Sequence, residues 1–190
     1  MKSNFFALLF RQKHIRRWGL MRNTTPETLT EHSAQVAVVA HALALAGNRY
    51  FGRSYNADRA ATMALFHDAC EVFTGDMPTP VKYFSPQMRE SYHEIENAAR
   101  DKLLGKLPRE LQADYAALLV ESDENLAILV KAADKICALV KCIEEEKSGN
   151  TEFASAKRTL WAAVEEIDLP EVKWFVENAL GGFALDVDEL

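Results

Sequence analysis

Apolar positions along most of the chain recur every three or four residues, which is the period of an amphipathic helix. No stretch alternates with the period of two that is typical of a strand. In the first periodic segment Phe6, Leu9 and Phe10 share one face. The pattern therefore predicts an all-α fold, with helices over residues 3–14, 31–46, 57–73, 87–106, 108–121, 123–147, 151–167 and 170–180.

Residues that favour helix ends separate these segments. Thr30 is a candidate N-cap for the helix over residues 31–46. Thr28 with Glu31 fits a capping box instead, so two starting points remain open. Further caps are predicted at Asn56 and at either Ser122 or Asp123.

The composition is that of a globular protein: 48% of the 190 residues are hydrophobic and 26% are charged. We expect one domain over residues 1–190. No run approaches the roughly 18 to 20 apolar residues that a membrane span needs, so no membrane partner is expected. Cys70, Cys137 and Cys142 are odd in number and form no C-x-x-C pair, which favours reduced thiols and a cytoplasmic protein.

The net charge of −6 gives no general attraction to a nucleic-acid polymer. A small anion still binds where a few cations gather, and the densest cationic segment contains His14, Arg16 and Arg17, followed by Arg22. A solvated helix end is the alternative interpretation of that segment.

The stretch over residues 64–79 concentrates reactive side chains. It holds His67, the three carboxylates Asp68, Glu71 and Asp76, and the hydroxyl of Thr79. On a helix Glu71 lies four positions after His67 and three after Asp68, so these groups can face one volume. A turn that contains Gly and Pro follows. This combination is more typical of a functional site than of a packed hydrophobic core.

Two polar residues interrupt apolar helix faces elsewhere. His32 extends the face that contains Val36 and Val39, where a hydrogen-bonded core histidine is the alternative to a metal ligand. Asp134 lies in the middle of an apolar stripe, and an unpaired buried carboxylate costs several kcal/mol. An ion pair with a lysine such as Lys131 is the alternative there.

Together with the central stretch, these residues suggest a metal site. His32, His67, Asp68 and Asp134 supply two imidazoles and two carboxylates from three predicted helices. Such a set neutralises a divalent cation and leaves positions open for water and substrate. Its mixed nitrogen and oxygen ligands suit Mn²⁺, Co²⁺, Fe²⁺, Ni²⁺ or Zn²⁺ better than Mg²⁺ or Ca²⁺.

The order H…HD…D on separate helices resembles the HD-domain metal-dependent phosphohydrolases, and the wider sequence is similar to their bacterial 5′-deoxynucleotidase family. The similarity runs from about residue 5 to about residue 160 and weakens after about residue 165. The segments that carry it are Arg17-Trp18, Glu31-His32-Ser33, His67-Asp68-Ala69-Cys70-Glu71, Thr74-Gly75-Asp76-Met77-Pro78-Thr79-Pro80-Val81-Lys82-Tyr83-Phe84 and Lys131-Ala132-Ala133-Asp134.

The resemblance implies an HD-type helical bundle with the metal between helices. It also implies hydrolysis of deoxyribonucleoside 5′-monophosphates to deoxynucleoside and phosphate, with deoxyribose preferred over ribose, in a homodimer. One divalent ion per chain is expected, with Co²⁺ or Mn²⁺ first and Zn²⁺, Fe²⁺, Ni²⁺ or Cu²⁺ as alternatives.

Glu71 and Arg17 are the expected catalytic residues. Glu71 is a carboxylate beside the proposed ligands, placed to orient or deprotonate water. By resemblance, the planar fork of Arg17 holds the phosphate. The ligands His32, Asp68 and Asp134 are expected to border the substrate as well.

The resemblance assigns the nucleoside side to two further segments. Trp18 is expected to crowd the 2′ position of the sugar, and Asp76 to accept a hydrogen bond from the 3′-hydroxyl. The Met77-Pro78-Thr79 turn completes the wall, and Lys82 is a further candidate for its rim.

Two other functions compete with this hypothesis. One is an HD phosphohydrolase that acts on deoxynucleoside triphosphates or cyclic nucleotides, although a triphosphate site should gather more cations than Arg17 and Lys82. The other is a regulatory module that binds nucleotide without turnover. The presence of Glu71 together with all four candidate ligands favours an enzyme.

Overall fold

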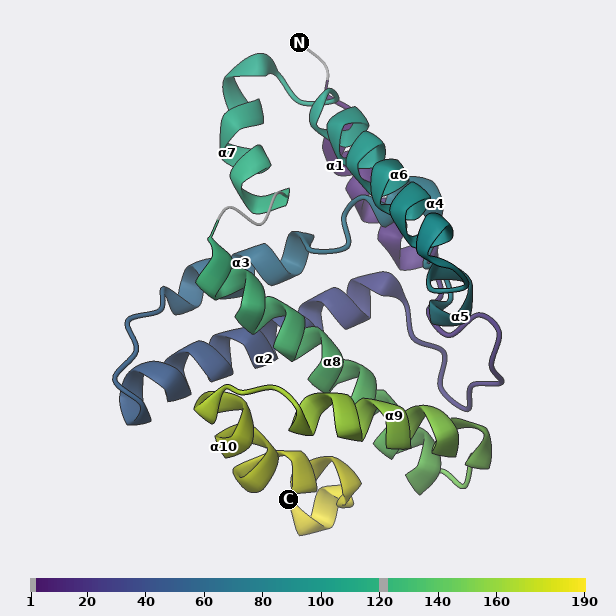
Figure 1. Cartoon of the computed structure of the whole chain (residues 1–190), viewed down its shortest axis with the longest axis vertical. Coiled ribbons are helices and arrows are strands. Elements are labelled where there is room, and N and C mark those ends of the chain that lie inside the picture. Colours follow the sequence, from purple (N-terminus) through teal and green to yellow (C-terminus); the bar gives the residue numbers. More distant parts are fainter. Residues whose placement is uncertain (1–2, 120–122) are drawn as a thin grey trace.

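The computed structural model describes residues 3–119 and 123–190, and these residues form helices joined by loops, of which the one over residues 15–28 is long (Figure 1). Within this part of the chain there is no strand, only an isolated antiparallel bridge between Arg16 and Thr28. The all-α prediction is therefore confirmed. The helices are α1 Phe5–Leu9, α2 Leu29–Tyr50, α3 Ala57–Phe66, α4 Glu71–Thr74, α5 Thr79–Lys82, α6 Pro86–Leu104, α7 Arg109–Leu119, α8 Glu124–Lys147, α9 Ala154–Glu165 and α10 Pro170–Asn178, with 3₁₀ turns η1 Phe10–His14, η2 Thr151–Phe153, η3 Leu180–Ala184 and η4 Val187–Glu189.

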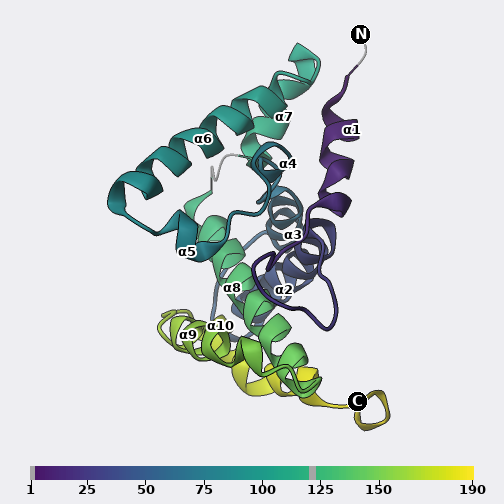
Figure 2. The ribbon, with the colours of Figure 1, turned by 90° about the vertical axis from the view of Figure 1, so that its right-hand side faces the viewer.

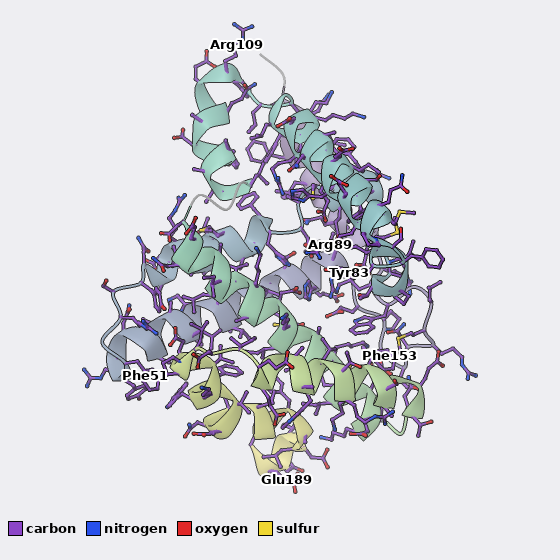
Figure 3. The ribbon with its side chains drawn as sticks, in the orientation of Figure 1. Phe51, Tyr83, Arg89, Arg109, Phe153 and Glu189 are labelled. Atoms are coloured by element: carbon purple, nitrogen blue, oxygen red, sulfur yellow. The ribbon has the colours of Figure 1, made fainter. Side chains whose placement is uncertain are left out.

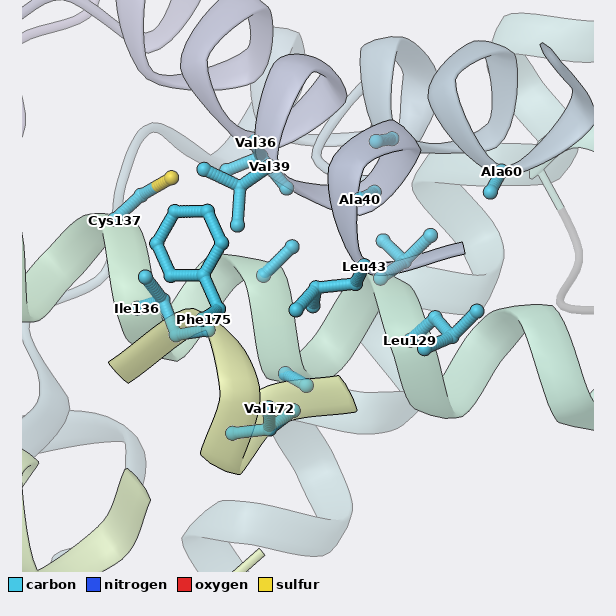
Figure 4. Close-up of a cluster of buried hydrophobic side chains, with 14 of the residues drawn as sticks. Val36, Val39, Ala40, Leu43, Ala60, Leu129, Ile136, Cys137, Val172 and Phe175 are labelled. Carbon is cyan, nitrogen blue, oxygen red and sulfur yellow. The ribbon is translucent and has the colours of Figure 1, made fainter. Parts of the chain in front are cut away.

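The larger hydrophobic core lies between α2, α3, α8 and α10, and α9 adds the buried side chain of Val164. Figure 4 shows the ring of Phe175 among apolar side chains of α2 and α8, including Val39 and Ile136. Leu43 and Leu129 are fully buried in the same cluster. Burial of this much apolar surface is the main force that holds the long helices together.

A second, smaller core joins α1 to α6 and α7. Phe5 is fully buried there, and its ring meets that of Tyr115 edge to face at 4.9 Å. Both views show α2, α3 and α8 between this group and the C-terminal pair α9 and α10 (Figures 1 and 2). Ala69, in the turn after α3, belongs to the smaller core and so links it to the centre of the molecule.

Helix starts largely follow their caps. The Thr28 side chain accepts from the Glu31 N–H, and the Glu31 side chain accepts from the Thr28 N–H, so the capping-box alternative is correct and Thr30 is not the cap. Asn56 and Asp123 cap α3 and α8 as predicted. The alternative cap Ser122 and the predicted helix end near residue 121 lie outside the described residues.

The predicted face of the first helix is wrong. Phe6 and Phe10 are 43% and 71% exposed, whereas Phe5 is buried. The α-helical part ends at Leu9, and the chain continues as a 3₁₀ helix. Phe5 fills the smaller core, with Leu8 and Leu9 packed beside it, so the face of α1 that packs is rotated from the one that the apolar pattern predicts.

The predicted helix over residues 57–73 is interrupted. It stops at Phe66, and a turn carries the chain to α4. Backbone hydrogen bonds in the turn span three residues rather than four, as from the Ala69 N–H to the Phe66 carbonyl at 3.0 Å. Ala69 and Cys70 face the buried side of the turn. His67 and Asp68 therefore lie in a turn between two helices.

Within the described residues, no helix has both the length and the apolar character needed to cross a membrane.

Candidate functional site

The turn between α3 and α4 presents His67 and Asp68 to the first turn of α2. The His67 Nδ1 lies 2.7 Å from the Ala64 carbonyl, and its Nε2 lies 3.0 Å from Asp68 Oδ2. Because a carbonyl only accepts, Nδ1 carries the proton of that hydrogen bond. Nε2 is therefore the nitrogen of His67 that is available to a cation.

His32 approaches the same carboxylate from α2. Its side chain is fully buried, and its Nε2 lies 3.9 Å from Asp68 Oδ2 and 2.9 Å from Asp134 Oδ1 on α8. The rings of His32 and His67 are 5.4 Å apart between centroids. Two helices, α2 and α8, and the turn after α3 thus bring together the four residues that the sequence singled out.

The donor atoms of this cluster fit a divalent cation. Ligand atoms of His32, His67 and Asp68 all lie within 4.8 Å of one another, and Asp134 is adjacent to His32. Carboxylate oxygens lie 2.9 and 3.0 Å from Nε2 of His32 and His67, yet neither of these buried nitrogens makes a well-aligned hydrogen bond within the described part of the chain. Buried polar atoms are almost always satisfied, so two unsatisfied nitrogens that face carboxylates suit a metal ion.

The charges in the cluster are strongly coupled. Burial opposes the charged form of His67, but the adjacent Asp68 carboxylate outweighs it and raises the pKa of His67 to about 9. Burial likewise opposes ionisation of Asp68, yet His67, His32 and Arg17 hold the pKa of its carboxyl well below its usual range. Asp68 is therefore an anion with several cationic or proton-bearing neighbours.

Glu71, at the start of α4, is a buried carboxyl close to this cluster. Its residue is 7% exposed, and within the described residues Oε2 has no hydrogen-bond partner. Burial raises the pKa of Glu71 to about 9, and the negative charges of Asp68 and Asp76 act in the same direction. A raised pKa close to reacting groups is typical of proton-transfer residues.

Arg17 joins the cluster to a second carboxylate. Its Nη1 lies 3.7 Å from Asp68 Oδ2 and 3.8 Å from Asp76 Oδ1, and its side chain is 12% exposed. Asp76 follows Gly75, whose φ of +72° ends α4 in a conformation that favours glycine. This turn directs the chain back towards Arg17.

Trp18 adopts a strained backbone conformation next to Arg17. Its φ is +58°, which for a bulky side chain costs on the order of 1–3 kcal/mol and marks sites where surrounding contacts hold the strain. Its carbonyl accepts from the Met21 N–H at 2.9 Å, and its indole Nε1–H donates to Glu27 Oε2 at 3.1 Å. The indole ring also packs on Phe153, with 5.3 Å between centroids.

A cavity of about 580 Å³ opens beside these residues. Arg17, Asp76 and Asp134 connect it to the histidine cluster. Its lining contains the segments expected to hold substrate, together with part of α9: Arg17, Trp18, Gly19, Leu20, Met21, Asp76, Met77, Pro78, Thr79, Pro80, Tyr83, Asp134, Lys135, Ala138, Ser155, Ala156, Thr159 and Leu160.

Lys82 lies apart from this cavity. Its Nζ donates to Glu96 Oε1 at 2.8 Å and lies 4.6 Å from the centroid of the Tyr92 ring, so its ammonium group faces α6. Tyr83, the next residue, follows the C-terminal end of α5 and does line the cavity; it is labelled in Figure 3.

Two residues that support the site gave no signal in the sequence. Glu27 is buried and receives hydrogen bonds from both Arg17 and Trp18, but it lies in a loop where no helical period marks it. Phe153, labelled in Figure 3, is fully buried against Trp18. Nothing in the sequence distinguishes it from any other aromatic residue of a hydrophobic core.

The loop before α2 is anchored on α8. Glu145 is 1% exposed, and its carboxylate accepts from the Thr24 hydroxyl at 2.6 Å and from the Thr25 N–H at 3.2 Å. Lys141 pairs with the same carboxylate and donates to the Thr25 carbonyl. Because buried charges need such partners, this network fixes the loop that follows Trp18.

Comparison with known proteins places this chain in a well-populated family. The sequence model described as 5′-deoxynucleotidase YfbR-like matches residues 4–183. A 5′-deoxynucleotidase of Vibrio parahaemolyticus is 49% identical over 191 residues, which cover 100% of this chain and 98% of that protein. The 5′-deoxynucleotidase YfbR of Escherichia coli is 50% identical over 192 residues, covering 100% and 96%.

Solved structures give the same fold. An HD-domain phosphohydrolase from Listeria innocua superposes with a TM-score of 0.84 at 25% identity, over 97% of this chain and 90% of that one. A cyanophage S-2L HD phosphohydrolase, DatZ, solved with dA and one catalytic Zn²⁺, superposes with a TM-score of 0.65 at 21% identity, over 92% and 95%. The expected HD-type helical fold is confirmed.

The environment of Glu71 predicts a pH dependence of stability once divalent ions are removed with a chelator. Because the folded-state pKa is raised from 4.5 to about 9, Glu71 ionises more readily in the unfolded chain. Below the unfolded pKa of about 4.5, Glu71 is protonated in both states and does not lower the free energy of unfolding. As the pH rises from there towards 9, Glu71 ionises only in the unfolded chain, and the free energy of unfolding falls. Urea unfolding should show Glu71→Gln gaining stability relative to the wild type between these pH values.

Glu90→Gln, at an exposed position of α6, is the matched control and should show no such gain. A stability difference between Glu71→Gln and the wild type that stays constant with pH would contradict this account of the Glu71 environment.

Proposed function

The chain belongs to the YfbR-like 5′-deoxynucleotidase family of HD phosphohydrolases, and from this membership we propose how its residues hydrolyse deoxyribonucleoside 5′-monophosphates. The family resemblance seen in the sequence is confirmed by the matched model and by relatives about half identical over the whole chain. The protein is thus a phosphoric monoester hydrolase that depends on a divalent metal ion. Residue roles, sugar selection and metal identity are the parts that we propose.

His32, His67, Asp68 and Asp134 are the proposed metal ligands. Their support is the convergence of two unsatisfied imidazole nitrogens with two carboxylates from three segments. A divalent ion held there supplies Lewis-acid chemistry, which offsets negative charge on the phosphoryl group. The mixed ligand set favours Co²⁺ or Mn²⁺, with Zn²⁺, Fe²⁺, Ni²⁺ and Cu²⁺ as alternatives.

Arg17 is the proposed phosphate-binding residue. Its terminal nitrogen lies within 4 Å of both Asp68 and Asp76, so a phosphate beside Asp68 comes within reach of the guanidinium fork. Two parallel N–H donors match two phosphate oxygens. This interaction both positions the phosphorus and stabilises charge in the transition state.

Glu71 is the proposed residue that transfers the proton of the attacking water. A cation beside Asp68 and His67 favours the ionised form of Glu71, which then accepts a proton from the attacking water. The water oxygen forms a bond to phosphorus while the bond from phosphorus to the 5′-oxygen breaks. Returning the proton from Glu71 to that 5′-oxygen balances the reaction and releases deoxynucleoside and phosphate.

Trp18 and Asp76 form the proposed sugar site. Both line the cavity, together with Met77, Pro78 and Thr79. The Trp18 ring, fixed on Phe153, crowds the 2′ position, and the Asp76 carboxylate accepts from the 3′-hydroxyl. A 2′-hydroxyl is a small feature for a pocket to exclude, so selectivity on the order of 10- to 100-fold is expected.

The cavity argues against a triphosphate substrate. The cationic side chains in its described lining are Arg17 and Lys135, while Lys82 faces Glu96. Three phosphate groups would need more positive charge than this. The presence of Glu71 beside a complete ligand set likewise argues against a module that binds nucleotide without turnover.

Residues 1–190 form one HD-type domain in this proposal. It acts as a homodimer in the cytoplasm on a small nucleotide, with no nucleic-acid polymer or membrane as partner. Exposed apolar side chains on α2, Val38 and Leu45, support a second copy, and the free, buried thiols of Cys70, Cys137 and Cys142 support a reducing compartment.

The observation that carries the proposal is the position of Arg17, between the metal ligand Asp68 and the sugar-side residue Asp76. It is tested by phosphate release from deoxy- and ribonucleoside mono-, di- and triphosphates with Mn²⁺, Co²⁺, Zn²⁺ or Mg²⁺. Deoxyribonucleoside monophosphates with Mn²⁺ or Co²⁺ should turn over fastest. Preferential release from triphosphates, or none from any compound, would contradict it.

Trp18→Ala tests sugar selection. Removing the indole opens the 2′ position, so kcat/KM for ribonucleoside monophosphates should rise relative to their deoxy counterparts by about tenfold or more. Trp161→Ala, on the surface of α9 and outside the cavity lining, is the control and should keep the wild-type ratio. An unchanged ratio in Trp18→Ala would contradict the steric account.

A further inference from the structure

Glu27 lies where the loop before α2 is tied to the segment that carries Arg17 and Trp18. Its carbonyl accepts from the Arg17 N–H at 3.0 Å, next to the bridge between Arg16 and Thr28. The residue is 7% exposed, although it is a glutamate in a loop. A carboxylate is seldom buried unless specific donors compensate its lost hydration.

Those donors are the two residues that face the substrate. Glu27 Oε2 accepts from Arg17 Nε at 3.2 Å and from the Trp18 indole Nε1 at 3.1 Å. The other oxygen, Oε1, lies 3.9 Å from Nδ1 of His32. We propose that Glu27 is a positioning residue, whose single carboxylate oxygen sets the phosphate-binding Arg17 and the sugar-facing Trp18 as one unit.

For Arg17, the contact decides which nitrogens reach the substrate. The guanidinium has carboxylates on several sides, because Asp68 and Asp76 lie 3.7 and 3.8 Å from Nη1. With Nε engaged by Glu27, the planar group cannot turn to pair fully with either aspartate. Its terminal nitrogens therefore stay directed at the place where phosphate binds.

For Trp18, the contact fixes the ring plane. The positive φ of this residue gives its side chain an unusual exit direction, and such a conformation persists only where surrounding contacts hold it. Phe153 supports one part of the indole, and Glu27 holds its N–H. Without Glu27, the ring keeps a packing partner but loses its only described hydrogen-bond acceptor.

The inference rests on the proposed function, since it assumes that Arg17 binds phosphate and Trp18 faces the sugar. It adds that phosphate binding and sugar selection depend on a common residue that does not itself contact substrate. Changing Glu27 should therefore affect KM for the nucleotide and the ratio of deoxy to ribo turnover together.

Three substitutions of Glu27 distinguish the effect of the position of its carboxylate from the effect of its charge. Glu27→Gln keeps length and an oxygen acceptor without the charge. Glu27→Asp keeps the charge but is shorter by one bond, and Glu27→Ala removes both. Positioning predicts that Glu27→Gln retains most of the deoxy-to-ribo ratio. Glu27→Asp and Glu27→Ala should raise KM and lower kcat/KM for deoxynucleotides by about 100-fold, with loss of that ratio.

Glu31→Ala is the matched control. It removes a nearby glutamate whose hydrogen bonds go to Thr28 in the capping box, so it should lower stability without changing the ratio. Wild-type kinetics in the same assay test the proposed function separately. If the wild type turns over deoxynucleoside monophosphates but Glu27→Asp and folded Glu27→Ala keep its ratio, only the positioning role is overturned.

A nucleotide-free measurement reports on the same contact. The chain contains three tryptophans, so a ¹⁵N-labelled sample gives three indole N–H signals, and the signal absent from Trp18→Phe identifies Trp18. In Glu27→Asp that signal should move upfield and exchange faster with solvent, while in Glu27→Gln it should stay close to the wild-type position. An unchanged Trp18 signal in Glu27→Asp would overturn the proposal.

Discussion

The carboxylate of Asp68 must be held between cationic or proton-bearing groups in a mostly buried position, and the other side chains of the site are arranged around this requirement. Its Oδ2 lies 3.0 Å from His67, 3.9 Å from His32 and 3.7 Å from Arg17. Desolvating a carboxylate is costly unless such groups surround it. The side chains that stabilise this anion are therefore also those that suit the two proposed ligands: the imidazole nitrogens suit a divalent cation, and the Arg17 guanidinium suits a phosphate.

This constraint explains why the backbone departs from regular helix where it does. A continuous helix through residue 73 would place His67 and Asp68 on neighbouring sides of one cylinder. The turn after Phe66 instead sends Ala69 into the smaller core and leaves both polar side chains facing α2 and α8. The strained φ of Trp18 has a similar effect, since it directs the indole towards Glu27 and Phe153. Regular packing in the larger core supplies the rigid frame for both irregular segments.

Two kinds of feature can be predicted from the sequence: helix caps, which depend on hydrogen bonds between residues close in the chain, and polar residues that interrupt an apolar helix face. His32 and Asp134 stood out because each interrupts an apolar stripe, and the structure brings their side chains to 2.9 Å. The caps at Asn56 and Asp123 follow from side-chain hydrogen bonding within one turn. The helix break at His67 could not be predicted, because apolar spacing continues across it and tertiary packing decides the winding. Glu27 was missed for a similar reason, since its partners are ten and nine residues away and meet only in the folded loop.

In the proposed mechanism, the metal ion is bound by His32, His67, Asp68 and Asp134, while Glu71 moves the proton. The most direct test of this mechanism is the manganese content of wild-type, Glu71→Gln and His67→Ala protein after loading and dialysis, with turnover measured on the same samples. The wild type should retain about one ion per chain, Glu71→Gln about one ion without turnover, and His67→Ala little metal. Loss of the ion from Glu71→Gln, or its full retention by His67→Ala, would contradict the account.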